Sequence, residues 1–192
     1  MTKREIKIVN IVVSSSLGHD IPLEKMAATL SNTEYNPEQF PGLVLRIKEP
    51  KTSALIFSSG KIVCTGARSL DKVEESIKQI IKSLEKIGIK ITIKPEIKIQ
   101  NTVASGSIGF DLNLNVLAMK LENTEYEPEQ FPGLVYKLEE AKATFLLFSN
   151  GKIVCTGTKS EEAVHQAVDK LIENLKKIGI TENKTQAAVK PK

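Results

Sequence analysis

The residue types that most often carry catalytic or metal chemistry are scarce in this chain of 192 residues, which has two Cys, two His and no Trp. Cys64 and Cys155 are too few for a disulfide scaffold or a four-thiolate metal site. Neither His19 nor His165 has an evident partner in the sequence. The Gly-Lys pair in GKIVCTG lacks the order of residues that makes a phosphate-binding loop. The sequence therefore predicts no metal, no cofactor and no catalytic residue.

The residues that stand out instead are repeated. Residues 31–44 read SNTEYNPEQFPGLV and residues 122–135 read ENTEYEPEQFPGLV, while SSGKIVCTG at 58–66 is matched by SNGKIVCTG at 149–157. Both pairs are separated by 91 residues, and the same offset aligns two long segments without a gap, with about 42 of 82 positions identical. A duplication of this kind, with two copies only, favours one pseudo-twofold domain over a solenoid.

The duplication also sets the expected boundaries. They are a basic N-terminal extension (1–7), a first repeat (8–89), a linker (90–98), a second repeat (99–180) and a basic tail (181–192). The tail is polar without an apolar period, so we expect it to be disordered. The chain has a net charge of +4, but the first repeat carries +1 and the second −3. No apolar run reaches the length of a transmembrane helix, and the N-terminus does not resemble a secretory signal.

Each repeat is expected to contain about five strands and two helices. In the first repeat, β-branched or alternating segments predict four strands, at residues 6–16, 42–47, 53–57 and 61–65. The turn-rich stretch at residues 32–42 has room for a fifth, very short strand. Residues 20–30 predict a short helix, and Ser69 predicts the cap of a long helix that ends at Gly88. Short turns require antiparallel pairing. The sequence thus predicts an α+β fold with a ten-stranded antiparallel sheet and four helices.

Four helices can cover one face of such a sheet and not both. The face left bare should be polar, but it combines apolar groups with a few polar ones: Asn10, Val12, Ser14, Val44, Arg46, Ser53, Leu55, Phe57, Lys61, Val63 and Thr65. An apolar face without a cover is typical of a binding surface. The alternative is a face buried in an obligate dimer.

The duplication and the YNPEQFPGLV, YEPEQFPGLV and SGKIVCTG motifs resemble the TATA-binding protein family in its archaeal form, over about residues 6–180. The resemblance implies a saddle, in which a curved ten-stranded antiparallel sheet carries four helices on its convex face. It also implies that the concave face enters the minor groove of an A·T-rich element and bends the DNA.

The resemblance assigns roles to residues in both repeats. The side chains that insert between base steps are Phe40, Phe57, Phe131 and Phe148. The minor-groove contacts are Asn10, Val12, Leu55, Val63, Thr65, Asn101, Val103, Leu146, Val154 and Thr156. The phosphate ligands are Arg46, Lys51, Lys61, Lys137, Lys142 and Lys152. Two departures from the family pattern are Lys137, at the position that matches Arg46, and a C-terminus that is not acidic.

These residue types suit the minor groove. A·T and T·A pairs present only acceptors there, whereas G·C adds an amino donor. An apolar strip would leave that amino group desolvated and unpaired, while Asn and Thr can donate to the acceptors. Lys and Arg neutralise phosphates and make binding depend on salt.

The implied partners are double-stranded A·T-rich DNA, transcription factor B, and RNA polymerase indirectly, in an archaeal cytoplasm and its nucleoid. Glu127 and Glu129 are the residues expected to meet transcription factor B. A homodimer of the free protein is left open, and so are two other functions: a dimeric carrier with an apolar groove for a lipid or peptide, and an accessory nucleic-acid-binding domain of an enzyme.

Overall fold

The computed structural model describes residues 5–182. Most of the basic extension and most of the tail expected to be disordered lie outside the described residues. Within the described part, the chain forms two compact units. We call them the N-terminal unit (residues 9–101) and the C-terminal unit (residues 102–182 with residues 5–8).

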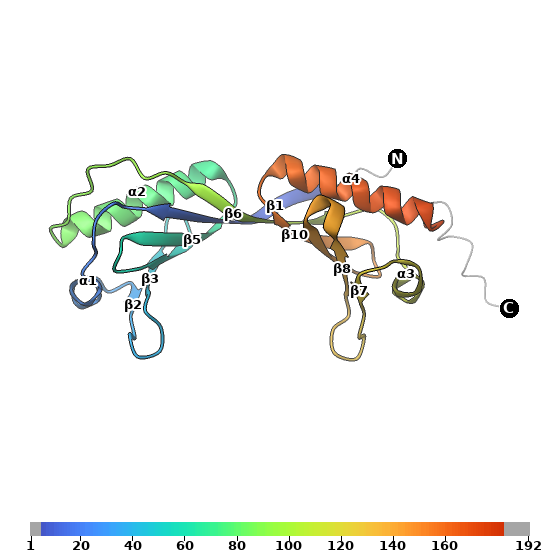
Figure 1. The fold of residues 1–192 in the computed structure, drawn as a ribbon, viewed down its shortest axis with the longest axis horizontal. Helices are drawn as coiled ribbons and strands as arrows, with labels where there is room; N and C mark the ends of the chain where they lie inside the picture. The colour runs from blue at the N-terminus through green and yellow to red at the C-terminus, as the bar shows by residue number, and fades with distance from the viewer. Residues whose placement is uncertain (1–4, 183–192) are drawn as a thin grey trace. The chain divides into compact units, whose positions relative to one another are not determined.

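Ten strands form one sheet in the order β2-β3-β4-β5-β1-β6-β10-β9-β8-β7 (Figure 1). The first half comprises β1 (Glu5–Ser16), α1 (Leu23–Thr29), β2 (Thr33–Glu34), β3 (Leu43–Ile47), β4 (Thr52–Ile56), β5 (Lys61–Ala67) and α2 (Leu70–Lys86). The second half comprises β6 (Lys98–Ser107), α3 (Leu114–Lys120), β7 (Thr124–Glu125), β8 (Leu134–Leu138), the 3-10 turn η1 (Glu139–Ala141), β9 (Ala143–Leu147), β10 (Lys152–Thr158) and α4 (Glu161–Lys177). The predicted α+β fold with ten strands and four helices is confirmed.

The long helices begin and end where the sequence predicts. The Ser69 hydroxyl accepts a hydrogen bond from the Lys72 backbone N–H at 3.3 Å, and the Ser160 hydroxyl accepts one from Ala163 N–H at 3.0 Å. Each bond satisfies an N–H that the helix cannot pair internally. Gly88 follows α2 with a φ of 86°, a conformation that favours glycine. None of the helices in residues 5–182 has the length and apolar character needed to cross a membrane.

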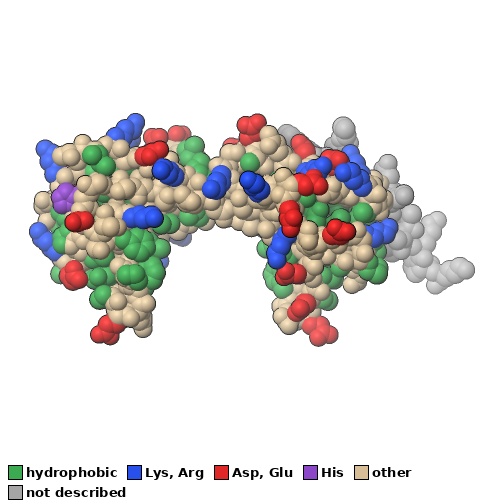
Figure 2. Space-filling model, viewed as in Figure 1, with side chains coloured by type: hydrophobic (Ala, Val, Ile, Leu, Met, Phe, Trp, Pro, Cys, Tyr) green, Lys and Arg blue, Asp and Glu red, His purple; other side chains and the backbone are tan. Residues whose placement is uncertain are grey.

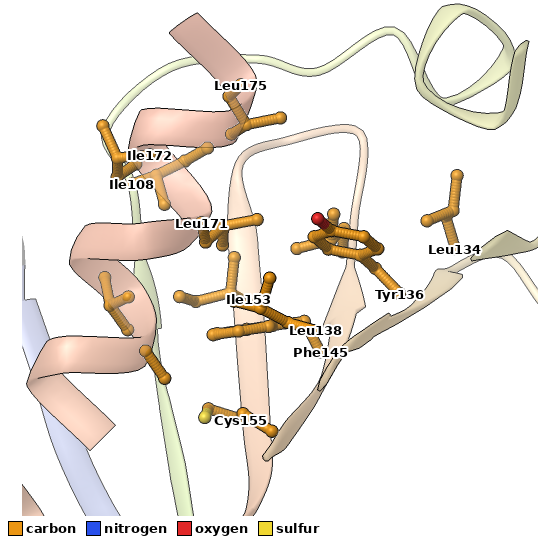
Figure 3. Close-up of a cluster of buried hydrophobic side chains, with 14 of the residues drawn as sticks. Ile108, Leu134, Tyr136, Leu138, Phe145, Ile153, Cys155, Leu171, Ile172 and Leu175 are labelled. Carbon is orange, nitrogen blue, oxygen red and sulfur yellow. The ribbon is translucent and has the colours of Figure 1, made fainter. Parts of the chain in front are cut away.

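The core of the C-terminal unit lies between α4 and one face of its strands (Figure 3). Phe145 from β9 and Leu171 from α4 are fully buried there. Tyr136 is the polar member of this cluster, and its hydroxyl accepts a hydrogen bond from Asn174 Nδ2 at 2.9 Å. Burial of this apolar surface determines which face of each strand packs against the helix. The opposite face of each strand is then left without a helix.

Candidate nucleic-acid interface

Side chains in the strands alternate between a buried face and a face that no helix covers. In the N-terminal unit Val13, Ala54 and Ile62 are at most 1% exposed. Their neighbours in the same strands, including Leu55 and Val63, are only half-buried. The prediction of which strand residues face the helices, and which do not, is therefore confirmed. We call the half-buried side the uncovered face of each unit.

An apolar row crosses the uncovered face of the N-terminal unit. Val44 in β3 pairs with Leu55 in β4, which pairs with Val63 in β5. Val63 is in turn opposite Ser14 in β1. Directly opposed side chains in neighbouring strands lie next to each other, so three branched aliphatic groups make a continuous smooth strip that ends at a hydroxyl.

A polar row runs beside the apolar row. Arg46, Ser53 and Thr65 are opposite one another in β3, β4 and β5. Asn10 completes the row, because its Nδ2 donates to Thr65 Oγ1 at 3.0 Å while its Oδ1 accepts from the Gly66 backbone N–H at 2.7 Å. The row therefore presents a guanidinium, two hydroxyls and an amide alongside the aliphatic strip.

The C-terminal unit repeats both rows. Its apolar row pairs Val135 with Leu146 and Leu146 with Val154, which is opposite Ser105. Its polar row pairs Lys137 with Thr144 and Thr144 with Thr156. Asn101 and Val103 are half-buried in β6, as Asn10 and Val12 are in β1.

Each unit also carries a pair of Phe rings. Phe40 and Phe57 have centroids 5.9 Å apart in an edge-to-face arrangement, and Phe131 and Phe148 have centroids 6.0 Å apart in the same arrangement. Phe40 is 44% exposed and Phe131 is 42% exposed. Phe57 is positioned by the hairpin before β5, where its backbone N–H donates to Lys61 O at 2.9 Å. Each pair therefore holds one exposed ring against a half-buried one, and flat apolar rings of this kind can replace the stacking that bases lose when a step is opened.

Two of the predicted phosphate ligands are paired with carboxylates. The Arg46 guanidinium lies 2.9 Å from Glu34 Oε1, and Lys137 Nζ lies 2.8 Å from Glu125 Oε1. Hydrogen bonding from Arg46 lowers the pKa of Glu34, and hydrogen bonding from Lys137 lowers the pKa of Glu125. Both carboxylates belong to the two-residue strands β2 and β7.

The remaining predicted phosphate ligands are exposed at strand ends. Lys61 and Lys152 begin β5 and β10, and Lys51 and Lys142 lie in the turns before β4 and β9. Lys142 has a left-handed backbone with a φ of 49°. Exposed cations at such edges can approach phosphates without losing much hydration.

The residues expected to meet a protein partner lie apart from both rows. Glu127 and Glu129 are exposed in the loop between β7 and β8. The turn is closed by Gln130 N–H and Phe131 N–H, which both donate to Glu127 O at 3.0 Å. Figure 2 shows acidic side chains at the far end of this loop.

The structure thus gathers most of the predicted contact residues into two equivalent surfaces. The predicted contact residues did not include several members of the rows: Ser14, Val44, Ser53, Ser105, Val135 and Thr144. Alternation already places Ser14, Val44 and Ser53 on the uncovered face, and the same parity in the second repeat would add Ser105, Val135 and Thr144. The ion pairs of Arg46 and Lys137 left no signal in the sequence pattern.

The two thiols are core residues. Cys64 and Cys155 are each 1% exposed, and burial raises the pKa of both thiols, that of Cys155 to about 11. Among residues 5–182 no group of His, Cys, Asp and Glu side chains is arranged to hold a metal ion.

Comparison with known proteins agrees with this geometry. A family model described as transcription factor TFIID (or TATA-binding protein, TBP) matches residues 5–87 and 96–178. The TATA-box-binding protein of Archaeoglobus fulgidus is 50% identical over 182 residues, which cover 94% of this chain and all of the relative. That of Methanocaldococcus jannaschii is 53% identical over 174 residues, covering 91% of this chain and 95% of the relative.

A solved structure of Methanococcus jannaschii TBP superposes with a TM-score of 0.84 at 53% identity, covering 90% of this chain and 99% of the other. The match includes both repeats and therefore both uncovered faces. The family consists of transcription factors and not of enzymes, in agreement with the predicted lack of a catalytic role. The chain belongs to the TATA-binding protein family.

Proposed function

We propose that this protein recognises a TATA promoter element through the minor groove, bends it, and recruits transcription factor B and thereby RNA polymerase. The observation that carries the proposal is the repeated surface in which an aliphatic row lies between a polar row and a pair of Phe rings, one of them exposed. The relatives from Archaeoglobus fulgidus and Methanocaldococcus jannaschii, both named TATA-box-binding protein, point the same way.

The aliphatic rows favour A·T pairs by exclusion. Val44, Leu55 and Val63 offer no hydrogen-bond acceptor to the guanine amino group. A G·C pair pressed against them would lose the hydration of that donor without replacement. An A·T pair has no donor in the minor groove, so contact with the same strip leaves no donor unpaired.

The Phe pairs supply the bend. Inserting a ring between base steps costs stacking energy that is offset by the ring's own contacts and by the additional surface that bent DNA can reach. This wedge mechanism is the one that general accounts of minor-groove binding use this family to illustrate. Here it is supported by the exposure of Phe40 and Phe131.

Binding and bending are tested with one labelled duplex. A TATA-containing duplex with a fluorophore at each end reports affinity by titration and bending by energy transfer, against a G·C-rich duplex of equal length. Wild type should prefer the TATA duplex and bring the fluorophores closer. Phe57→Ala and Phe148→Ala should each weaken binding and reduce the energy transfer, with unchanged far-UV circular dichroism. Equal transfer in both variants and wild type would exclude the wedge role.

The acidic loop of the second repeat is the proposed contact with transcription factor B. Glu127 occupies the position of Asn36, and Glu129 that of Glu38, so the two loops differ in charge although their neighbouring Phe pairs have similar geometry. Charges at an interface mainly set association rate and partner choice. A basic partner would therefore select this loop and give the complex a direction.

Glu127→Lys with Glu129→Lys tests that contact, with Asn36→Lys and Glu38→Lys as the matched control in the first repeat. The double change in the second repeat should leave DNA binding within about threefold and strongly reduce recruitment of transcription factor B in a gel-shift titration. Normal recruitment by this variant, or its loss in the control alone, would assign the partner to a different surface.

A further inference from the structure

The hydrogen bonds of Asn10 depend on a β-bulge in β5. Ile11 in β1 pairs with Ala67 and Val13 pairs with Cys64, so two residues of β5 lie opposite the single residue Val12. Those two residues are Thr65 and Gly66. The register shift lets β5 continue past Thr65, where the sequence predicted its end, to Ala67.

Gly66 is suited to this bulge in two ways. Its φ of 101° is a conformation that side chains rarely permit. A Cβ at this position would also lie 3.2 Å from the Lys51 carbonyl oxygen and 3.3 Å from Thr52 Cα. A bulge redirects the backbone groups of the residues that it contains, and here it directs the Gly66 N–H at Asn10 Oδ1 at 2.7 Å.

This contact fixes the orientation of the Asn10 carboxamide. A backbone N–H can only donate, so the carboxamide atom that faces it must be the oxygen. The nitrogen then faces Thr65 and donates to Oγ1 at 3.0 Å. The Thr65 hydroxyl donates to Asn10 Oδ1 at 3.3 Å, and one Nδ2 hydrogen is left for a ligand.

We propose that the Gly66 backbone N–H is a specificity-determining group: it holds Asn10 as a hydrogen-bond donor toward DNA and prevents the carboxamide from presenting its oxygen to a guanine amino group. The inference rests on the proposed minor-groove function and adds to it the source of discrimination at the base pair that Asn10 faces.

The reason lies in the two faces of a carboxamide. An unrestrained Asn can rotate to donate to adenine N3 or thymine O2, or to accept from guanine N2. By itself it would therefore tolerate both kinds of base pair. Rotation at Asn10 would leave the Gly66 N–H facing an NH₂ group, so that hydrogen bond would be lost, whereas the Thr65 hydroxyl could donate to the rotated oxygen. The aliphatic rows exclude guanine by desolvation, whereas this device excludes it by the direction of a single polar group.

The β-bulge with a glycine of positive φ occurs in both repeats. In β10, Cys155 pairs with Ala104 and Thr158 pairs with Thr102, so Thr156 and Gly157 form the equivalent bulge, and Gly157 has a φ of 96°. The N-terminal unit is the better place for a test, because there every partner of the carboxamide is defined by a distance.

The test replaces one backbone N–H by oxygen. Glycolic acid in place of Gly66 converts the Thr65–Gly66 amide into an ester, whose oxygen cannot donate to Asn10. The matched control is the same replacement at Gly88, whose N–H donates to Glu85 O at 3.0 Å at the end of α2. Affinity is measured for a TATA duplex and for duplexes in which single adenines become 2,6-diaminopurine, which adds the minor-groove amino group and leaves the rest of adenine intact.

At the pair that Asn10 faces, diaminopurine should weaken binding by wild type and by the Gly88 ester about tenfold. The Gly66 ester should lose most of this difference and bind both duplexes within about threefold of each other. A structural role of the hydrogen bond alone would lower affinity for all duplexes alike. Full discrimination by the Gly66 ester would therefore overturn the inference and leave the proposed function intact.

Failure of the proposed function has a different signature, since wild type would then show no preference for the TATA duplex over the G·C-rich one. A second measurement does not require the ester to fold. In uniformly labelled wild type without DNA, scalar coupling across the hydrogen bond should connect Gly66 ¹⁵N with the Asn10 side-chain carbonyl carbon. The absence of that coupling, with couplings of other hydrogen bonds visible, would also overturn the inference.

Discussion

Arg46 and Lys137 are each paired with a carboxylate. Under the proposed function, Glu34 would compete with a phosphate for Arg46, and Glu125 would compete with one for Lys137. Neither pair was predictable from sequence: Glu34 and Arg46 are 12 residues apart and meet only because β2 pairs with β3. Repetition of the arrangement in both units indicates that it belongs to the fold and not to one loop.

Glu34→Gln is expected to raise affinity for DNA about two- to fivefold, because it removes a charged competitor for Arg46. Glu38→Gln, which removes the same charge from the following loop, is the control and should have a smaller effect. Titration at constant salt measures both. Weaker binding by Glu34→Gln would instead mean that the carboxylate positions Arg46 for a phosphate.

The sign of the pH dependence follows from the lowered pKa of Glu34. The carboxylate stays ionised to lower pH than an ordinary glutamate, so the pair is present at neutral pH and is lost as the pH falls through the lowered pKa. Because both side chains are exposed, we expect little effect on folding stability.

At the scale of elements, alternation predicted the strand faces because a period of two residues leaves little freedom once one face is buried. The same rule fails at a bulge. The predicted strand ended at Thr65, yet β5 continues through Gly66 to Ala67. Caps were predictable because Ser69 satisfies local N–H groups, whereas contacts between hydroxyls distant in sequence were not.

One such contact distinguishes the two units. Thr52 Oγ1 lies 2.9 Å from Ser76 Oγ, which also donates to Lys72 O at 2.7 Å, and both residues are buried. The equivalent residues in the C-terminal unit are Ala143 and Ala167. We expect Thr52→Ala to lower the free energy of unfolding by about 1–2 kcal/mol.

The double variant Thr52→Ala with Ser76→Ala should lose less than the sum of the single changes, with a coupling of about 0.5–1.5 kcal/mol. Urea denaturation measures the cycle. Ser83→Ala is the control, because Ser83 Oγ donates to Gln79 O at 2.9 Å in the same helix without this partner. Additive losses would show that the two hydroxyls do not stabilise each other.

Burial of Cys155 in β10 predicts an alkaline effect. The folded pKa is about 11 against an ordinary value of 9.0, so the unfolded chain loses the proton first. The stabilisation is fully present below pH 9.0 and is lost as the pH rises toward 11. Between these values wild type should lose up to about 1.4 kcal/mol per pH unit more than Cys155→Ala. The free energy of unfolding, measured by urea denaturation at several pH values, checks this expectation. An equal pH dependence of that free energy in the two proteins would contradict the effect of burial.

For the whole molecule, the duplication was the most informative feature of the sequence. It predicted ten strands and four helices, and it placed four Phe residues at equivalent positions. The duplication could not predict where the repeats differ in their hydrogen bonds. Thr52 and Ser76 are replaced by alanines in the second repeat, but the sequence does not show that the two hydroxyls meet after folding. The charge difference between the repeats is visible in sequence, but the partner that would use it is not.

Under the proposed function, both uncovered faces read the minor groove. The most direct measurement is binding to a duplex in which every A·T pair of the TATA element is replaced by inosine·cytosine. That duplex has the major-groove pattern of G·C without the minor-groove amino group. We predict that the protein binds it within about threefold of the A·T duplex, and binds the corresponding G·C duplex at least about tenfold more weakly. Binding to the inosine duplex as weak as to the G·C duplex would contradict minor-groove recognition.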